Sequence, residues 1–225
     1  MVTGGTRGIG HAVAERFRTL GDQVVAVGRD ECDVTDEPAV AALFDRLGAV
    51  DVLVNGAGIS ESAPLHRTTL ASWRAQLAVN ATGAFLCTRA AVPAMRERGS
   101  GRVVTVASTA GRAGTPYTAA YTASKHAAVG LMRAVAAELA GSGVTANAVC
   151  PTFVDTDMTR ASVARIAERT GRSEAESAAA LESASPLGRL LAPGEVAAAV
   201  LWLASAEAAA CNGQTIVLDG GGIQA

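Results

Sequence analysis

Hydrophobic residues along this chain gather in short β-branched runs that alternate with longer alanine-rich segments of helical periodicity. The runs are continuously apolar rather than alternating, which is typical of parallel strands covered by helices on both faces. The predicted strands are Met1–Val2, Gln23–Val27, Val50–Val54, Arg102–Ala107, Val144–Val149 and Thr215–Leu218. The predicted helices are Gly10–Leu20, Glu37–Leu47, Leu70–Arg98, Ala119–Ala140 and Pro193–Ala204. This alternation predicts one α/β domain over residues 1–225, a doubly wound parallel sheet with helices on both faces.

After the second predicted strand the chain is too short for the expected topology. Val27 is separated by only three residues from Glu31–Val34, which has the character of the end of a further strand. Neighbouring parallel strands need a crossover of about a dozen residues or more, usually a helix. Either a βαβ element has been lost here or a segment after Asp30 is omitted from the sequence. Omission is the favoured interpretation.

The segment Thr156–Ser185 differs from the rest of the chain in composition. It is rich in arginine and glutamate and has helical spacing, but it holds few apolar residues. A helix with so little apolar surface cannot bury a core of its own. We therefore expect a mobile flap over about residues 156–190 rather than a second domain.

Charge and hydropathy argue against several classes of protein. The formal net charge is −2 and the pI is about 5.9, so no basic field favours nucleic acid or an anionic membrane surface. Apolar runs such as Ala197–Ala204 are far shorter than the roughly 18 residues of a membrane span. The four cysteines have no metal-type spacing, so no metal site is expected. No leader precedes the first glycine turn, which favours a cytoplasmic protein.

The only lysine of the chain, Lys125, lies four residues after Tyr121, one of two tyrosines. All the remaining residues among the 19 lysines and arginines are arginines. Positions i and i+4 share one helix face, so the phenol and the ammonium project into one site. An ammonium beside a phenol favours the phenolate and lowers a pKa that is ordinarily near 10. The pair predicts a tyrosine that serves as a general acid or base.

Glycine-rich turns follow two of the predicted strands. Thr3–Gly10 reads T-G-x-x-x-G-x-G, and such a turn lets the backbone and a helix N-terminus approach a pyrophosphate. Asn55–Gly58 follows the third strand, and Ser108 follows the fourth at the same edge, where open α/β sheets bind ligands. Asn80 lies inside a predicted helix shortly before Gly83, a combination that would loosen the helix.

In order and context, these motifs resemble the short-chain dehydrogenase/reductase family along essentially the whole chain: Thr3–Gly10, Asn55–Gly58, Asn80, Ser108, Tyr121-x-x-x-Lys125 and Pro151–Thr156. The resemblance implies a Rossmann-like fold and an NAD(P)-dependent enzyme that transfers a hydride between a nicotinamide and a carbonyl/alcohol pair. It implies that Tyr121 is the acid/base and that Lys125 binds the nicotinamide ribose and lowers the Tyr121 pKa. Ser108 would hydrogen-bond to the substrate oxygen, and Asn80 would hold a water linked to Lys125.

The resemblance also implies a set of cofactor-binding residues: Gly4, Thr6, Arg7, Gly8, Ile9, Gly10, Arg29, Asp33, Val34, Asn55, Ala57, Gly58, Tyr121, Lys125, Pro151, Val154 and Thr156. Arg7 and Arg29 favour NADP(H), because a guanidinium grips a 2′-phosphate bidentately. Asp30 is a counter-signal, and NAD(H) stays open. Two positions depart from the family pattern, since Gly56 stands in place of a second asparagine and Thr152 in place of a glycine.

The stretch Val154–Thr159 and the long insert after it resemble those of reductases of 3-oxoacyl thioesters and polyketides. The favoured substrate is therefore an acyl thioester or polyketide-like ketone, with a steroid, sugar or other secondary alcohol as the alternative. A non-catalytic dinucleotide sensor is the alternative of another class. The arginines of this region could meet a carrier phosphate, although acidic neighbours favour a solvated face for most of them: Arg160, Arg165, Arg169, Arg172 and Arg189. A homotetramer or homodimer is expected.

Overall fold

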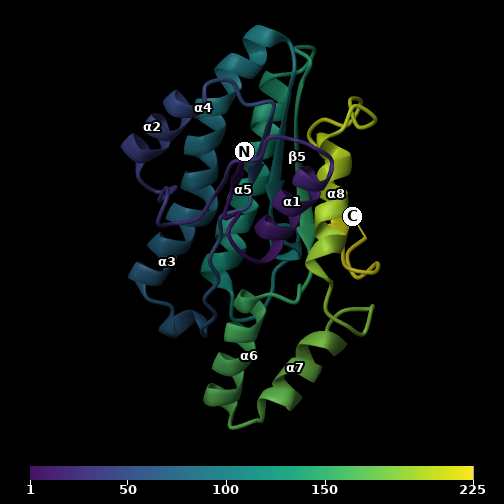
Figure 1. Ribbon diagram of the computed structural model, residues 1–225. Coiled ribbons are helices and arrows are strands. Elements are labelled where there is room, and N and C mark those ends of the chain that lie inside the picture. The colour runs from purple at the N-terminus through teal and green to yellow at the C-terminus, as the bar shows by residue number, and fades with distance from the viewer. Residues whose placement is uncertain (225) are drawn as a thin grey trace.

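The computed structural model describes residues 1–224, and its six parallel strands form one sheet in the order β2-β1-β3-β4-β5-β6 (Figure 1). The strands are β1 (Val2–Thr3), β2 (Ala26–Val27), β3 (Val52–Asn55), β4 (Gly101–Val106), β5 (Val144–Pro151) and β6 (Thr215–Leu218). The helices are α1 (Gly8–Thr19), α2 (Glu37–Leu47), α3 (Leu70–Leu77), α4 (Gly83–Arg98), α5 (Ala119–Glu138), α6 (Asp157–Thr170), α7 (Glu174–Ser183) and α8 (Pro193–Ala204). The predicted doubly wound α/β fold is confirmed.

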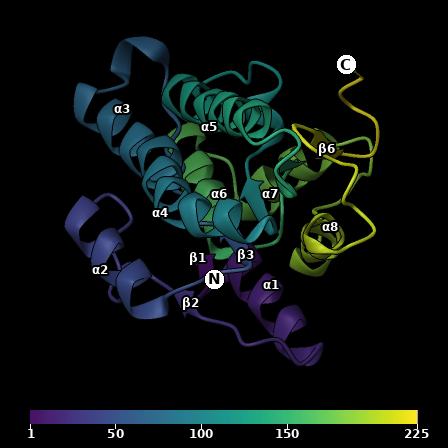
Figure 2. The ribbon, with the colours of Figure 1, turned by 90° about the horizontal axis from the view of Figure 1, so that it is seen from above.

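Helices cover both faces of the sheet (Figure 2). Helices α1 and α8 pack against each other on one face, whereas α2, α4 and α5 cover the other. Successive residues of a strand face opposite sides of the sheet. Leu53 therefore belongs to the core beneath α2 and α4, and Val54 belongs to the core beneath α1 and α8. Because the inner strands are buried on both sides, they read in the sequence as continuous apolar runs.

The chain reverses its direction across the sheet at β1. Strand β2 lies on one side of β1, and the chain then returns through α2 to place β3 on the other side. In open α/β sheets such a reversal leaves a crevice beyond the carboxyl ends of the two strands. The turns Thr3–Gly10 and Asn55–Gly58 leave the sheet at this point, which brings the two glycine-rich segments together.

The region after β2 differs from the prediction. Glu31–Val34 is a connecting loop and not the end of a further strand. Helix α2 makes the crossover from β2 to β3, so β2 is the edge of the sheet. It is shorter than the predicted Gln23–Val27 because its partner β1 has only two residues. The omission of a segment after Asp30 stays a prediction.

The long helix predicted over Leu70–Arg98 is interrupted at its centre. Helices α3 and α4 are joined by a π-helical turn, Ala78–Thr82, which contains the buried Asn80. Turns of this kind widen the helix locally and occur frequently at functional sites. The predicted loosening of the helix at Asn80 is confirmed.

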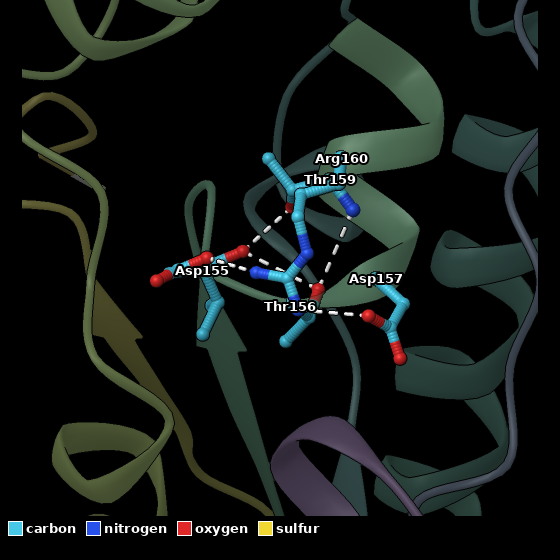
Figure 3. A network of polar contacts seen from close by, with 6 residues as sticks. Asp155, Thr156, Asp157, Thr159 and Arg160 are labelled. Atoms are coloured by element: carbon cyan, nitrogen blue, oxygen red, sulfur yellow. Dashed lines mark hydrogen bonds and ion pairs between the residues drawn. The ribbon is translucent and has the colours of Figure 1, made fainter. Parts of the chain in front are cut away.

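Helices α6 and α7 form a hairpin that follows the carboxyl end of β5 and projects from the body of the molecule (Figure 1). Figure 3 shows the contacts that fix its start. Arg160 donates to Asp155 and Asp157 at 2.5 and 2.7 Å, and Thr159 Oγ1 donates to the Val154 carbonyl at 2.6 Å. Exposed ion pairs of this kind contribute little to stability, so they serve mainly to orient the first turn of α6. The predicted flap is thus a pair of helices.

Within residues 1–224, no helix combines the length and the apolar character that crossing a bilayer requires.

Candidate active site

The first glycine turn presents unpaired backbone donors to the crevice. Helix α1 begins at Gly8, its cap residue Arg7 makes no capping hydrogen bond through its side chain, and its first turn has no acidic residue. The N–H groups of this turn are therefore free to bind an anion, and the helix dipole favours one. Gly4 has a φ of +63°, and a Cβ there would lie 2.8 Å from the backbone of Ala57. Only glycine allows the two turns to approach so closely.

Thr3 ties the two glycine turns together. Its Oγ1 accepts hydrogen bonds from the N–H groups of Gly56 and Ala57 at 3.1 and 3.2 Å. Asn55 is 4% exposed, and its Nδ2 donates to Thr88 Oγ1 at 3.0 Å. The side chain of Asn55 therefore lies inside the end of the sheet. This hydrogen bond to Thr88 holds the start of the turn Asn55–Gly58 in place.

Lys125 is buried at the carboxyl edge of the sheet. The residue is 5% exposed, and its Nζ donates to the Val106 carbonyl at 2.9 Å. Burial lowers the pKa of this ammonium to about 8, because loss of hydration disfavours the charged form. The same Nζ lies 5.7 Å from the centroid of the Tyr121 ring. The two side chains thus share one site, as their i, i+4 spacing predicts.

The pKa of Tyr121 does not follow the prediction. Burial raises the pKa of the phenol above its ordinary value, and a hydrogen bond with the Ser108 side chain only partly offsets this rise. The expectation that Lys125 lowers this pKa is wrong for the polypeptide by itself, because loss of hydration outweighs any help that the phenolate receives. The resemblance correctly brings Ser108 and Tyr121 into contact. Ser108 Oγ also accepts the N–H of Ala110 at 3.1 Å, which fixes its orientation.

Asn80 reaches the site through the loop after β3. Its side chain bonds to both backbone groups of Ile59 and to Ser124 Oγ, each at 2.9 Å. A Cβ on Gly58 would lie 3.3 Å from Asn80 Oδ1 and 3.6 Å from Lys125 Nζ. Asn80 is therefore a neighbour of Lys125 across Gly58, and it fixes the loop that lies beside the ammonium.

A cavity opens at this edge of the sheet. The predicted site residues that line it are Ile9, Gly58, Ser108, Tyr121, Lys125, Pro151, Val154 and Thr156, and Met158 and Ser162 of α6 close one side. Thr156 also packs against the first glycine turn, since a Cβ on Gly8 would lie 3.3 Å from its methyl group. No cluster of metal-ligating side chains occurs in the part of the chain that the structure describes. A phenol, a hydroxyl and an ammonium converging on one cavity can stabilise and protonate a developing oxyanion.

Comparison with known proteins agrees with this geometry. Residues 29–222 match the family model described as enoyl-(acyl carrier protein) reductase. This chain belongs to the short-chain dehydrogenase/reductase family. The 3-oxoacyl-[acyl-carrier-protein] reductase MabA of Mycobacterium tuberculosis is 38% identical over 235 aligned positions, which cover 98% of this chain and 91% of that protein. D-threitol dehydrogenase of Mycolicibacterium smegmatis is 35% identical, with 98% and 91% covered.

A solved structure supports the same assignment. Actinorhodin polyketide ketoreductase with NADPH superimposes with a TM-score of 0.89 at 34% identity, over 98% of this chain and 95% of that one. Membership of the short-chain dehydrogenase/reductase family makes this protein an NAD(P)-dependent oxidoreductase. The residues around the free N–H groups of α1 and the cavity fit a dinucleotide, which would supply or accept the hydride there.

Around Arg29 and Asp33, which the sequence analysis places at the cofactor, charges are arranged differently from the prediction. Arg29 is largely exposed, and its Nε donates to Asp33 Oδ2 at 3.2 Å. Glu31, which the sequence analysis did not single out, accepts the N–H of Gly28 at 2.8 Å through Oε2. A Cβ on Gly28 would lie 2.6 Å from Thr6 Oγ1 and 3.0 Å from that carboxylate oxygen. A carboxylate therefore stands close to the first glycine turn.

Sequence reasoning missed Ser124 and the linking role of Thr3 within the glycine motif. Ser124 is fully buried, and its Oγ donates to the Tyr121 carbonyl at 2.7 Å while it accepts from Asn80. Thr3 links the glycine turns as described above. Their signal in the sequence is only that each is a small hydroxyl residue within a motif. Its partners lie far away along the chain, so the sequence alone does not reveal the contact.

Proposed function

We propose that this enzyme reduces a 3-oxoacyl thioester or polyketide-like ketone to the alcohol with NADP(H). The observation that carries the proposal is the cavity in which Ser108, Tyr121 and Lys125 meet beneath helix α6 of the long insert. A helix of this insert that closes over the reacting centre excludes water from a bulky substrate. Similarity to MabA and to actinorhodin ketoreductase supports this substrate class.

The protonation states of the site favour the direction of reduction. Hydride arriving at a carbonyl carbon builds negative charge on the oxygen, which Ser108 and Tyr121 stabilise by hydrogen bonds. With its pKa raised by burial, Tyr121 keeps its proton at neutral pH and can donate it to that oxygen. Lys125, with a pKa of about 8, is still largely charged at neutral pH and would hold the ribose hydroxyls and attract the developing phenolate.

A second candidate is a dehydrogenase of a polyol or other secondary alcohol. Hydroxyl side chains line much of the cavity, among them Ser60, Thr115, Thr118, Thr152 and Ser162, and such groups suit a substrate rich in hydroxyls. Similarity to D-threitol dehydrogenase points the same way. The complete set Asn80, Ser108, Tyr121 and Lys125 disfavours a non-catalytic sensor.

The preference for NADP(H) now depends on Arg7, since Arg29 is paired with Asp33. Arg7 is exposed at the start of α1, where a 2′-phosphate would gain a bidentate partner. We also propose that the enzyme works in the cytoplasm as a homotetramer or homodimer. Exposed aromatic side chains on α3, α4 and α8, namely Trp73, Phe85 and Trp202, offer apolar surface for association.

One experiment tests this function directly. Purified enzyme would be assayed with acetoacetyl thioesters, bicyclic ketones, polyols and steroids, each with NADPH and with NADH. The expected result is efficient reduction of thioesters or bicyclic ketones with NADPH. Turnover of a polyol or steroid without turnover of either ketone class would replace the substrate and keep the reaction class.

A further inference from the structure

Charge is distributed unevenly around the catalytic cavity. Among the cavity-lining residues of the described chain, Lys125 alone is charged, and its Nζ already donates to the Val106 carbonyl. A carboxylate or phosphate next to the reacting carbonyl would lose its hydration there without gaining a partner. The cavity therefore favours a substrate whose reacting end is uncharged.

Outside the cavity, helix α6 carries two cations on the same face as its cavity-lining residues. Met158, Ser162, Arg165 and Arg169 follow one another at intervals of four, three and four residues, so they form a single stripe on the helix. Met158 and Ser162 line the cavity. At the far end of the stripe, Arg169 Nη1 donates to the Ser62 carbonyl of the loop after β3 at 2.6 Å. Arg165 lies between these two points, one turn beyond the cavity wall.

Arg165 differs from the neighbouring arginines in having a buried side-chain nitrogen without an acceptor. Arg160 and Arg189 pair with carboxylates, and Arg169 bonds to a backbone carbonyl. The Nη1 atom of Arg165 is buried, and no residue among 1–224 accepts a hydrogen bond from it. A buried donor without an acceptor is destabilising. A bound anion would supply the missing acceptor.

We propose that Arg165 binds an anionic group, a phosphate or a carboxylate, at the distal end of a substrate whose reacting end is neutral. The inference rests on the proposed function, because it assigns a specificity-determining residue to the same cavity. A guanidinium suits either anion, since its planar fork donates two parallel hydrogen bonds to a pair of oxygens. An acyl group carried on phosphopantetheine has this arrangement of charge, and so does a long-chain keto acid.

The test uses pairs of substrates that share a reacting end and differ in distal charge. One pair is acetoacetyl-CoA and neutral acetoacetyl-N-acetylcysteamine, and the other is 7-oxooctanoate and its methyl ester. Arg165→Gln is expected to raise KM for the charged member by at least about tenfold, as loss of a charge-assisted hydrogen bond would. KM for the neutral member and kcat for both should not change. Arg172→Gln, in the turn between α6 and α7, is the matched control and should behave like the wild type.

The outcomes distinguish a phosphate from a carboxylate as the anion that Arg165 binds. A rise in KM of the Arg165→Gln variant for acetoacetyl-CoA alone identifies the anion as phosphate. A rise in KM for 7-oxooctanoate alone identifies it as carboxylate. Equal KM values for the charged and neutral members in wild type and variant would overturn the proposal, as would an equal rise for both members. If no thioester is reduced, the proposed substrate class fails, while the keto acid pair, measured as substrates or as competitive inhibitors, still decides the role of Arg165.

Discussion

The side chain of Asn80 and the backbone of Ile59 hold each other through two hydrogen bonds of 2.9 Å. Asn80 Oδ1 accepts the N–H of Ile59, and Nδ2 donates to its carbonyl. Nδ2 also donates to Ser124 on α5 at 2.9 Å. One amide in the π-helical turn therefore fixes both the loop at Gly58 and the helix that carries Tyr121 and Lys125.

We predict that Asn80→Ala lowers both stability and turnover. The change leaves two partly buried backbone groups of Ile59 without their partner, which costs about 1 kcal/mol in free energy of unfolding, the low end of the range for buried groups. The loop at Gly58 is then free to move, so kcat falls while the chemistry of Tyr121 is intact. Urea denaturation and steady-state rates measure the two effects. Asn80→Asp, which keeps the acceptor and loses the donor, should lie between the wild type and the alanine variant, and unchanged stability in both variants would contradict the prediction.

Tyr121→Phe is expected to abolish turnover and to leave dinucleotide binding largely intact. The substitution removes the only phenol in the cavity and keeps the ring that packs beside Lys125. Steady-state assays and a cofactor titration measure the two properties. Tyr117→Phe is the matched control, because the only other tyrosine is 68% exposed and does not line the cavity. Near-normal activity in the Tyr121 variant would rule out its role as the acid.

Lys125 should make stability depend on pH in a defined window. Burial lowers its pKa from 10.5 to about 8, so between these values the unfolded chain binds more protons than the folded one. The contribution of this group to the free energy of unfolding therefore rises with pH across the window. Above pH 10 the raised pKa of Tyr121 acts in the opposite sense, because the folded state then keeps a proton that the unfolded chain has lost.

The measurement is urea denaturation of the wild type and of Lys125→Met at several pH values. The stability of the wild type relative to the variant should rise by about 2 kcal/mol between pH 8 and pH 10. A difference that stays constant over this range would show that the ammonium is not destabilised by burial.

Cofactor preference should respond to Glu31. Its carboxylate lies at the N–H of Gly28 beside the first glycine turn, where it would repel a 2′-phosphate. Glu31→Gln is expected to raise kcat/KM for NADPH relative to NADH by about tenfold, equivalent to about 1.4 kcal/mol. Asp30→Asn is the control, since no hydrogen bond or ion pair of the described chain holds that side chain near the turn. Equal preference in wild type and E31Q would remove Glu31 from cofactor selection.

The segment after Asp30 leads to a prediction about the length of the protein. The alignment with MabA spans 235 positions although this chain has 225 residues, so that relative carries residues that this chain lacks. Although α2 already makes the crossover from β2 to β3, we predict from this difference that the protein from its natural source contains a further helix of about ten or more residues after Asp30. Intact-mass measurement decides the matter, and a mass of 22.6 kDa would show that the chain is as short as its sequence.

The sequence by itself determined the fold class and brought the candidate reacting groups to one place in the chain. Continuous β-branched runs separated by alanine-rich segments are typical of buried parallel strands with covering helices, and α2 and α8 begin and end where the periodicity predicts. Helical spacing alone brings Tyr121 and Lys125 to one face, since that relationship is local. The glycine turn at the start of α1 is local for the same reason.

Tertiary structure decided everything that depends on distant partners or on burial. The sequence predicts a lowered pKa for Tyr121 because it shows the neighbouring lysine and not the loss of water around both groups. It gives Arg29 and Arg165 the same character, whereas the fold pairs Arg29 with Asp33 and leaves the Nη1 atom of Arg165 buried without an acceptor. Hydration and pairing are properties of the packed molecule, because they are set by residues that lie far apart in the chain.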